Sequence, residues 1–123
     1  MIGILFGTLA VLLGAFAAHG LEKLIDADAL QTFETGVKYQ MYHSLFLLLL
    51  GSVRQIAEEK KKVICYLIVT GVVLFSFSIY LLATNGLTGF DFRAIGFVTP
   101  IGGSLLIAGW VLTGITAWKS FRE

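Results

Sequence analysis

Long apolar stretches separated by short polar segments dominate the chain. A membrane-spanning helix needs about 20 consecutive apolar residues, and residues 2–19, 36–53, 63–84 and 100–118 approach that length. These stretches leave no room for a separate soluble domain, so we expect a single integral membrane domain covering residues 1–123. The pattern predicts an all-α fold: a four-helix transmembrane bundle in which neighbouring helices run antiparallel.

The connection between the first two predicted spans has a helical pattern of its own. Apolar residues recur there at helical spacing, at Ala27, Leu30, Phe33 and Val37. Asp26 precedes the segment, and aspartate is one of the residue types that cap the start of a helix. We therefore predict a short interfacial amphipathic helix between spans 1 and 2, with Gly36 at the bend into the second span.

The composition supports a lipid environment. Apolar residues make up 57% of the chain and charged residues 14%, whereas soluble domains carry about 25% charged residues. The formal net charge is +1, so nothing in the charge points to a nucleic-acid partner. Cys65 is the only cysteine, which excludes a disulfide within the chain.

The distribution of basic residues predicts the orientation. Cytoplasmic segments of membrane proteins carry an excess of lysine and arginine. One side of the predicted bundle holds six of these residues: Arg54, Lys60, Lys61, Lys62, Lys119 and Arg122. The other side holds Lys23, Lys38 and Arg93. We expect a multi-pass protein of the cell membrane with both termini in the cytoplasm.

Small residues form a stripe on each of two predicted spans. Close packing of small residues drives much of the association between helices in lipid. The first span places Gly3, Gly7 and Gly14 on one face, and the fourth places Gly102 and Gly109 on one face. Two interpretations stay open at this point: packing inside one bundle, or the interface of a homo-oligomer.

Five polar or aromatic residues form the candidate site. Ionisable residues in a membrane are costly and therefore mark candidate functional positions. His43 lies one helical turn after Tyr39 and Gln40, and the candidates near the outer ends of the spans are His19, Tyr39, Gln40, Tyr42 and His43. Their roles stay open among a lock between helices, a proton relay, a site for a small polar group or lipid headgroup, and a metal site. The histidine spacing matches no compact metal motif, so we expect neither a metal nor another cofactor.

Three segments together resemble a known family. They are Gly14-Ala-Phe-Ala-Ala-His-Gly-Leu21, Phe33-Glu-Thr-Gly-Val-Lys-Tyr-Gln-Met-Tyr-His43, and Thr99-Pro-Ile-Gly-Gly103 followed by Gly109-Trp110. In this order the chain resembles the domain-of-unknown-function 423 family of small UPF-type membrane proteins, and it is similar to the animal transmembrane protein 256. The resemblance implies a helical membrane protein with four spans and implies no reaction. It also directs attention to the same five candidate residues.

The sequence offers no recognisable catalytic arrangement, so we expect a protein that is not an enzyme. Ser44 follows His43 directly, and adjacent residues do not face each other on a helix. Our first hypothesis is a membrane module that binds membrane lipids, a small ligand or a partner protein, as a homo-oligomer. The alternative is a small oligomeric transporter or channel for protons or a small solute, which would use His19 and His43.

Overall fold

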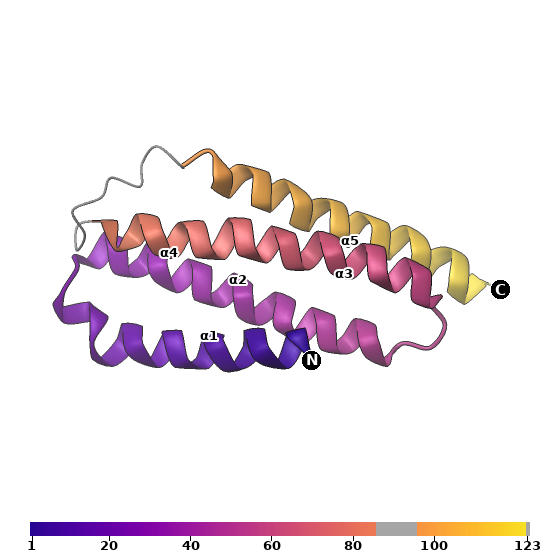
Figure 1. Cartoon of the computed structure of the whole chain (residues 1–123), viewed down its shortest axis with the longest axis horizontal. Helices are drawn as coiled ribbons and strands as arrows, with labels where there is room; N and C mark the ends of the chain where they lie inside the picture. The colour runs from indigo at the N-terminus through magenta and orange to yellow at the C-terminus, as the bar shows by residue number, and fades with distance from the viewer. Residues whose placement is uncertain (86–95, 123) are drawn as a thin grey trace.

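The computed structural model describes residues 1–85 and 96–122 and shows an all-α bundle (Figure 1). Its elements, in chain order, are α1 (Ile2–His19), the 3₁₀ turn η1 (Leu21–Lys23), α2 (Ala27–Ser52), α3 (Glu58–Val72), the π-helical segment η2 (Val73–Phe77), α4 (Ser78–Ala83) and α5 (Val98–Arg122). Elements α3, η2 and α4 follow one another without a break, so they form one long rod. The predicted all-α fold is confirmed.

The helices run alternately up and down the long axis of the bundle. In Figure 1, α1 and the α3–α4 rod run in one direction, while α2 and α5 run in the other. The contacts join α1 to α2, α2 to α3 and α4, and α3 to α5. The two termini therefore lie towards the same end as the connection between α2 and α3, and α1 and α5 form opposite edges of the bundle.

Helix α2 begins earlier than the predicted second span. The Asp26 side chain caps it by accepting a hydrogen bond from the backbone nitrogen of Ala29 at 2.7 Å, so the predicted cap is confirmed. The helix then continues through Gly36 without a break. A Cβ at Gly36 would lie 2.7 Å from the ring of Tyr80, so glycine serves close packing here and does not make a bend.

The predicted amphipathic helix is consequently the first part of α2 and not an element of its own. Its apolar face is buried in the bundle: Phe33 packs in a cluster with Ala17, Leu21 and Ala83, and its ring centroid lies 4.8 Å from that of Tyr80. The sequence pattern found the buried face correctly. It could not show that a neighbouring helix, instead of the membrane surface, covers this face.

Among the residues that the structure describes, three helical segments are long and apolar enough to cross a membrane: Ile2–Lys23, Glu58–Ala83 and Val98–Arg122. Each of the three carries large apolar side chains on its exposed surface, as lipid contact requires. Helix α2 has sufficient length, but its first half carries Asp28, Glu34 and Lys38. The predicted second span, 36–53, coincides with the more apolar second half of α2.

Both glycine stripes pack inside the chain. A Cβ at Gly7 would lie 2.7 Å from the Ser44 hydroxyl on α2, and a Cβ at Gly109 would lie 2.6 Å from Ile68 on α3. A Cβ at Gly102 would overlap the backbone nitrogen of Phe75 and lie 2.8 Å from the carbonyl carbon of Leu74. The close contacts along both glycine stripes are therefore made within one chain. An association between copies needs another surface.

We predict opposite effects for two glycine substitutions on α5. Gly102→Ala should lower the free energy of unfolding by about 1–3 kcal/mol, because rigid backbone surrounds the new methyl group. Gly114→Ala, which meets nothing within 4 Å, should leave stability unchanged or raise it by up to about 1 kcal/mol, since alanine favours the helix. Unfolding in mixed micelles, followed by circular dichroism, measures both variants. Equal effects of the two substitutions would contradict the packing described.

Candidate functional site

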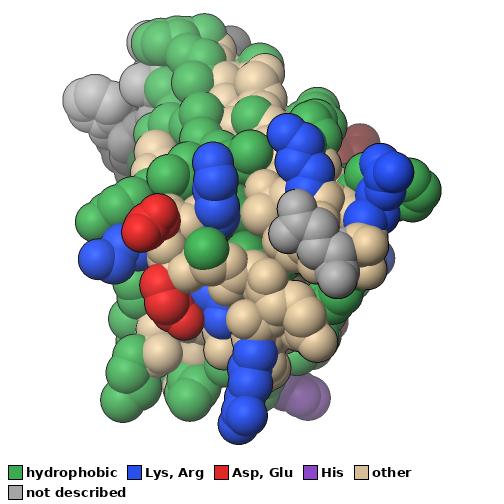
Figure 2. All heavy atoms as spheres, turned by 90° about the vertical axis from the view of Figure 1, so that its right-hand side faces the viewer, with side chains coloured by type: hydrophobic (Ala, Val, Ile, Leu, Met, Phe, Trp, Pro, Cys, Tyr) green, Lys and Arg blue, Asp and Glu red, His purple; other side chains and the backbone are tan. Residues whose placement is uncertain are grey.

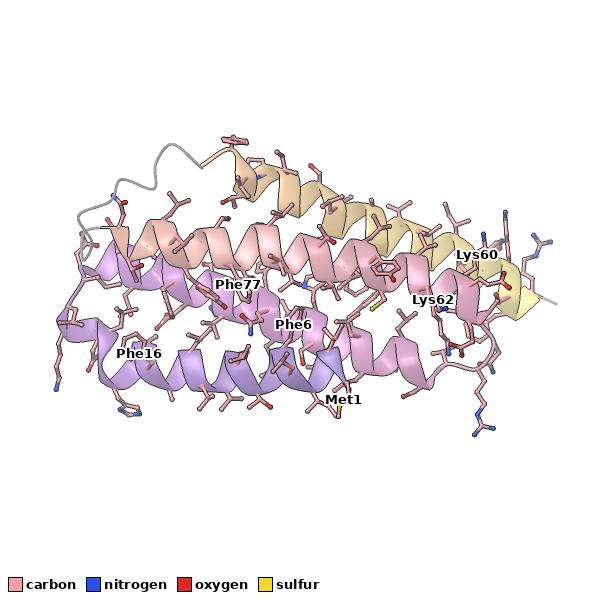
Figure 3. All side chains as sticks on the ribbon, viewed as in Figure 1. Met1, Phe6, Phe16, Lys60, Lys62 and Phe77 are labelled. Atoms are coloured by element: carbon pink, nitrogen blue, oxygen red, sulfur yellow. The ribbon has the colours of Figure 1, made fainter. Side chains whose placement is uncertain are left out.

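Gln40 ties three helices together inside the bundle. Its side chain is fully buried in α2. The amide nitrogen Nε2 donates to the Phe6 carbonyl oxygen of α1 at 2.8 Å, and the Tyr80 hydroxyl of α4 donates to Oε1 at 2.6 Å. Phe6 itself lies against Phe77, with ring centroids 6.5 Å apart (Figure 3). A polar side chain is stable here because both ends of its amide have partners.

Two buried serines add further bonds between helices. The Ser44 hydroxyl of α2 donates to the Gly3 carbonyl oxygen of α1 at 2.7 Å, and the Ser76 hydroxyl of η2 donates to the Gly36 carbonyl oxygen of α2 at 2.8 Å. In both pairs the acceptor is a glycine, whose missing side chain lets the serine reach the backbone. The hydroxyls and the close-packed glycines are thus parts of the same contacts.

His43 is buried, and a hydrogen bond occupies each of its ring nitrogens. The Trp110 indole nitrogen of α5 lies 3.0 Å from Nε2, and an indole nitrogen can only donate. Nε2 must therefore be the unprotonated acceptor. Nδ1 then carries the proton and donates to the Tyr39 carbonyl oxygen at 2.7 Å. The geometry defines a neutral histidine in a single tautomer, and it leaves neither nitrogen free for a metal.

Aromatic rings surround His43 on several sides. The Tyr39 ring lies 4.9 Å from Phe75, and the Phe46 ring lies 4.4 Å from Trp110, measured between centroids. The His43 ring itself lies 6.1 Å from Trp110. These contacts join α2, η2 and α5. Since η2 is a π-helical segment, Phe75 comes from a part of the rod that departs from regular α-helix.

The structure divides the five predicted site residues into separate groups. Gln40 faces α1 and α4, whereas His43 faces α5. The rings of Tyr39 and Tyr42 lie near each other, with centroids 5.8 Å apart and planes tilted by 55°, and the two residues are 40% and 55% exposed. The bundle therefore brings Tyr39, Tyr42 and His43 into one aromatic group, with Gln40 on a different face of α2.

His43 follows the first residue of α2 by 16 positions, which is about 24 Å along the helix at 1.5 Å per residue. His19 is exposed in the last turn of α1. The two histidines thus belong to different parts of the bundle.

Four further polar contributors, Ser44, Ser76, Tyr80 and Trp110, were not among the predicted residues. Tyr80 and Ser76 lie within an apolar run, where a polar residue is itself a signal of an inward contact. Trp110 carries an indole N–H that needs a partner when it is in lipid. No sequence signal could identify the Phe6 carbonyl as an acceptor, because every residue has one. Within residues 1–85 and 96–122, no three His, Cys, Asp or Glu side chains are grouped as metal ligands.

The apolar helices and their internal hydrogen bonds define a small helical membrane protein. The family model described as "Protein of unknown function (DUF423)" matches residues 13–103. A UPF0382 membrane protein of Staphylococcus saprophyticus is 40% identical over 119 residues, covering 97% of this chain and 95% of that protein. The chain belongs to the DUF423 family, as the resemblance implied.

Relatives from other bacteria show similar coverage. A UPF0382 membrane protein of Haemophilus influenzae is 38% identical over 118 residues, covering 94% of this chain and 90% of the relative. One of Bacillus subtilis is 36% identical over 121 residues, covering 97% and 94%. No solved structure matches the chain. The relatives identify a membrane protein, and their names state no activity.

We predict that Gln40 and Tyr80 are energetically coupled. Gln40→Leu should lower the free energy of unfolding by about 1–3 kcal/mol, because it leaves the Tyr80 hydroxyl without its acceptor. Once Gln40 is leucine, Tyr80→Phe should cost less than it does alone, with a coupling of roughly 0.6 kcal/mol or more. Unfolding of the four proteins of this double-mutant cycle in mixed micelles gives the coupling.

Tyr66→Phe is the matched control for this cycle. Tyr66 lies on α3, is 73% exposed, and makes no contact with Gln40 among those described. Its substitution should leave the free energy of unfolding unchanged. Strictly additive losses for Gln40→Leu and Tyr80→Phe would show that the hydrogen bond at 2.6 Å does not join them in the membrane protein.

Proposed function

We propose that this protein is a non-enzymatic integral membrane module that acts by associating with a second copy of itself in the membrane. The proposal draws on three observations. The chain belongs to a family of membrane proteins, its buried side-chain polar atoms within the described residues are all paired, and one exposed face carries tyrosine hydroxyls that have no partner within the described residues. The third observation is the one that carries the proposal.

This face, here called the tyrosine face, consists of Tyr39 and Tyr42 of α2 with Trp110 of α5. All three side chains are exposed. Tyr39 lies 5.8 Å from Tyr42 between ring centroids, and the buried His43 ring lies 6.3 Å from Tyr39 and 6.1 Å from Trp110, so His43 links the two helices beneath this face. Tyr39 lies 12 positions after the first residue of α2, and Tyr42 lies 10 positions before the last. Both tyrosines are therefore at least about 15 Å from either end of the helix.

Neither tyrosine hydroxyl has a hydrogen-bond partner in the described part of the chain. A hydroxyl in hydrocarbon without a partner costs free energy, and the bilayer core is about 30 Å thick. Tyrosine normally lies at the membrane interface, where its hydroxyl reaches the headgroups. Tyr42 follows the start of the predicted span, residue 36, by six positions, or about 9 Å along the helix, so its hydroxyl favours a face that another protein surface covers.

A second copy of the chain fits this face because a phenol is both a donor and an acceptor. A two-fold axis brings the same surface of both copies together. The hydroxyls of one copy then meet the hydroxyls of the other, and each side can donate to its partner. The glycine stripes are already filled within the chain, so the tyrosine face takes the role first considered for them.

The interior favours association over transport. A relay through His43 would first have to break the hydrogen bond from Trp110, since that bond occupies the only unprotonated nitrogen. Gln40, Ser44 and Ser76 are likewise engaged between helices. A transporter or channel for protons or small solutes would need these same side chains, which already hold the bundle together. We therefore rank this alternative second.

We also propose that α2 crosses the membrane and that both termini are cytoplasmic. Helix α1 and the α3–α4 rod run in the same direction (Figure 1), so the chain between them has to return across the bilayer. The six basic residues predicted for the cytoplasmic side lie at the end where α2 meets α3 and α5 ends, and Figure 2 shows basic side chains spread over this end. Lys23 follows α1 at the opposite end, and Arg93 lies outside the described residues.

We predict that residue 60 is labelled only from the cytoplasmic side. In a Cys65→Ser background, Lys60→Cys should react with a membrane-impermeant maleimide in inverted vesicles and stay unreacted in intact cells, because lysine-rich connections are retained inside. Glu22→Cys, in the η1 turn at the other end, is the matched control and should show the reverse. Labelling of position 60 from outside would reverse the proposed orientation.

We predict that the tyrosine face controls self-association. The double substitution Tyr39→Phe and Tyr42→Phe should raise the dimer dissociation constant by about one order of magnitude, because two bonds between helices at about 0.6 kcal/mol each are lost. Native mass spectrometry of protein released from mild detergent, over a range of concentrations, gives the constant.

Tyr66→Phe removes an exposed hydroxyl from α3, outside the tyrosine face, and should leave the dissociation constant unchanged. A wild-type protein that stays monomeric at every concentration would refute the proposed self-association. A dimer that is equally stable in all three proteins would instead place the interface on another surface.

A further inference from the structure

A cavity of about 380 Å³ opens at the basic end of the bundle. It lies where the last turns of α2 and the first turns of α3 extend past the start of α1 (Figure 3). Its lining includes Ile2, Leu47, Leu50, Lys61, Lys62 and Cys65. The volume is within the range of about 300–1,000 Å³ that is usual for ligand pockets. None of these residues belongs to the tyrosine face.

Lys61 is the unusual residue of this cavity. Only 11% of its side chain is exposed, although lysine is almost never buried without a partner. Its one ion pair within the described residues is with Glu58, at 3.5 Å, and that side chain is 85% exposed. Such a pair contributes little, because water screens the exposed carboxylate. The Lys61 side chain is thus largely covered by the protein, and its ammonium group has only a weak ionic partner.

Most of the remaining wall of the cavity is apolar, although the acidic side chain of Glu58 also lines it. Ile2, Leu47 and Leu50 come from α1 and α2 and line it together with Lys61 and Lys62 of α3. A ligand that satisfies both kinds of surface must carry an anionic group and a hydrocarbon chain. The bilayer supplies such a molecule at this depth, since Lys61 lies one turn into α3, just inside the basic connection. A free phosphate ion would satisfy the lysines and leave the apolar wall uncovered.

We propose that this cavity binds one anionic phospholipid, with its phosphate at Lys61 and Lys62 and an acyl chain along Ile2, Leu47 and Leu50. The cationic pair selects the headgroup, because a zwitterionic phosphatidylcholine presents its own cation next to the phosphate. This site goes beyond the proposed self-association and does not rest on it. The protein would accordingly recognise the composition of the cytoplasmic leaflet as well as a second copy of itself.

The test uses the full chain reconstituted in vesicles of equal parts phosphatidylglycerol and phosphatidylcholine, then released from mild detergent for native mass spectrometry. The wild type should retain one phosphatidylglycerol in preference to phosphatidylcholine. Lys61→Gln should lower this retention about fivefold, the factor expected for one basic residue at an anionic surface, while Lys61→Arg keeps the charge and should preserve it. Arg54→Gln, an exposed charge outside the cavity, is the matched control and should have no effect.

The single thiol gives a second measurement. Cys65 lines the cavity one turn after Lys61, so a bound lipid should shield it. Its reaction with a maleimide should be slower in phosphatidylglycerol vesicles than in phosphatidylcholine vesicles, and Lys61→Gln should abolish the difference. Circular dichroism of each variant verifies that the helices are intact.

Three results would overturn the lipid site: no retained lipid on the wild type, equal retention of both lipids, or an equal loss in Arg54→Gln and Lys61→Gln. None of these results bears on the tyrosine face, because Lys61→Gln leaves the dimer dissociation constant unaltered in our proposal. The lipid site and the self-association can therefore fail separately.

Discussion

The hydrogen bonds of Gln40 hold the bundle at the point where three helices meet. Lipid supplies no hydrophobic force between helices, so polar ties and close packing must supply the association. Gln40 reaches the backbone of α1 on one side and Tyr80 of α4 on the other. The register set by this tie also brings Gly3 to Ser44 and Gly36 to Ser76. The glycine contacts and the serine bonds therefore depend on the same alignment of helices.

Because the polar side chains of the interior bond the helices to one another, the groups available for recognition lie at the surface. His43, the residue that most suggests proton chemistry, donates to the Tyr39 carbonyl oxygen of its own helix and accepts from Trp110 of α5. The groups still available for recognition are the exposed tyrosines of α2 and the shielded lysine beside the start of α1. One of these surfaces suits a second copy of the chain, and the other suits an anionic lipid.

The family model covers some of the residues that tie the helices together and leaves others out. Residues 13–103 contain Gln40, His43, Ser76 and Tyr80, so the matched region includes the side chains that tie the helices. Phe6 and Trp110, which complete two of the bonds, lie outside it. The Phe6 contribution is a backbone carbonyl, which any residue at that position would supply. The Trp110 contribution needs an indole, so that position is the more informative one to compare among relatives.

The sequence by itself determined the helical class, the apolar stretches, the cap at Asp26 and the family, because these depend on local composition and periodicity. It also selected Gln40 and His43, since polar side chains in apolar stretches are costly. It missed the length of α2, whose polar first half buries only Phe33 and Gly36 and packs this one face against neighbouring helices. Only the tertiary structure decided which face each polar group takes. A hydrogen bond such as that between Gln40 and Tyr80 joins residues 40 positions apart, and no local pattern records that distance.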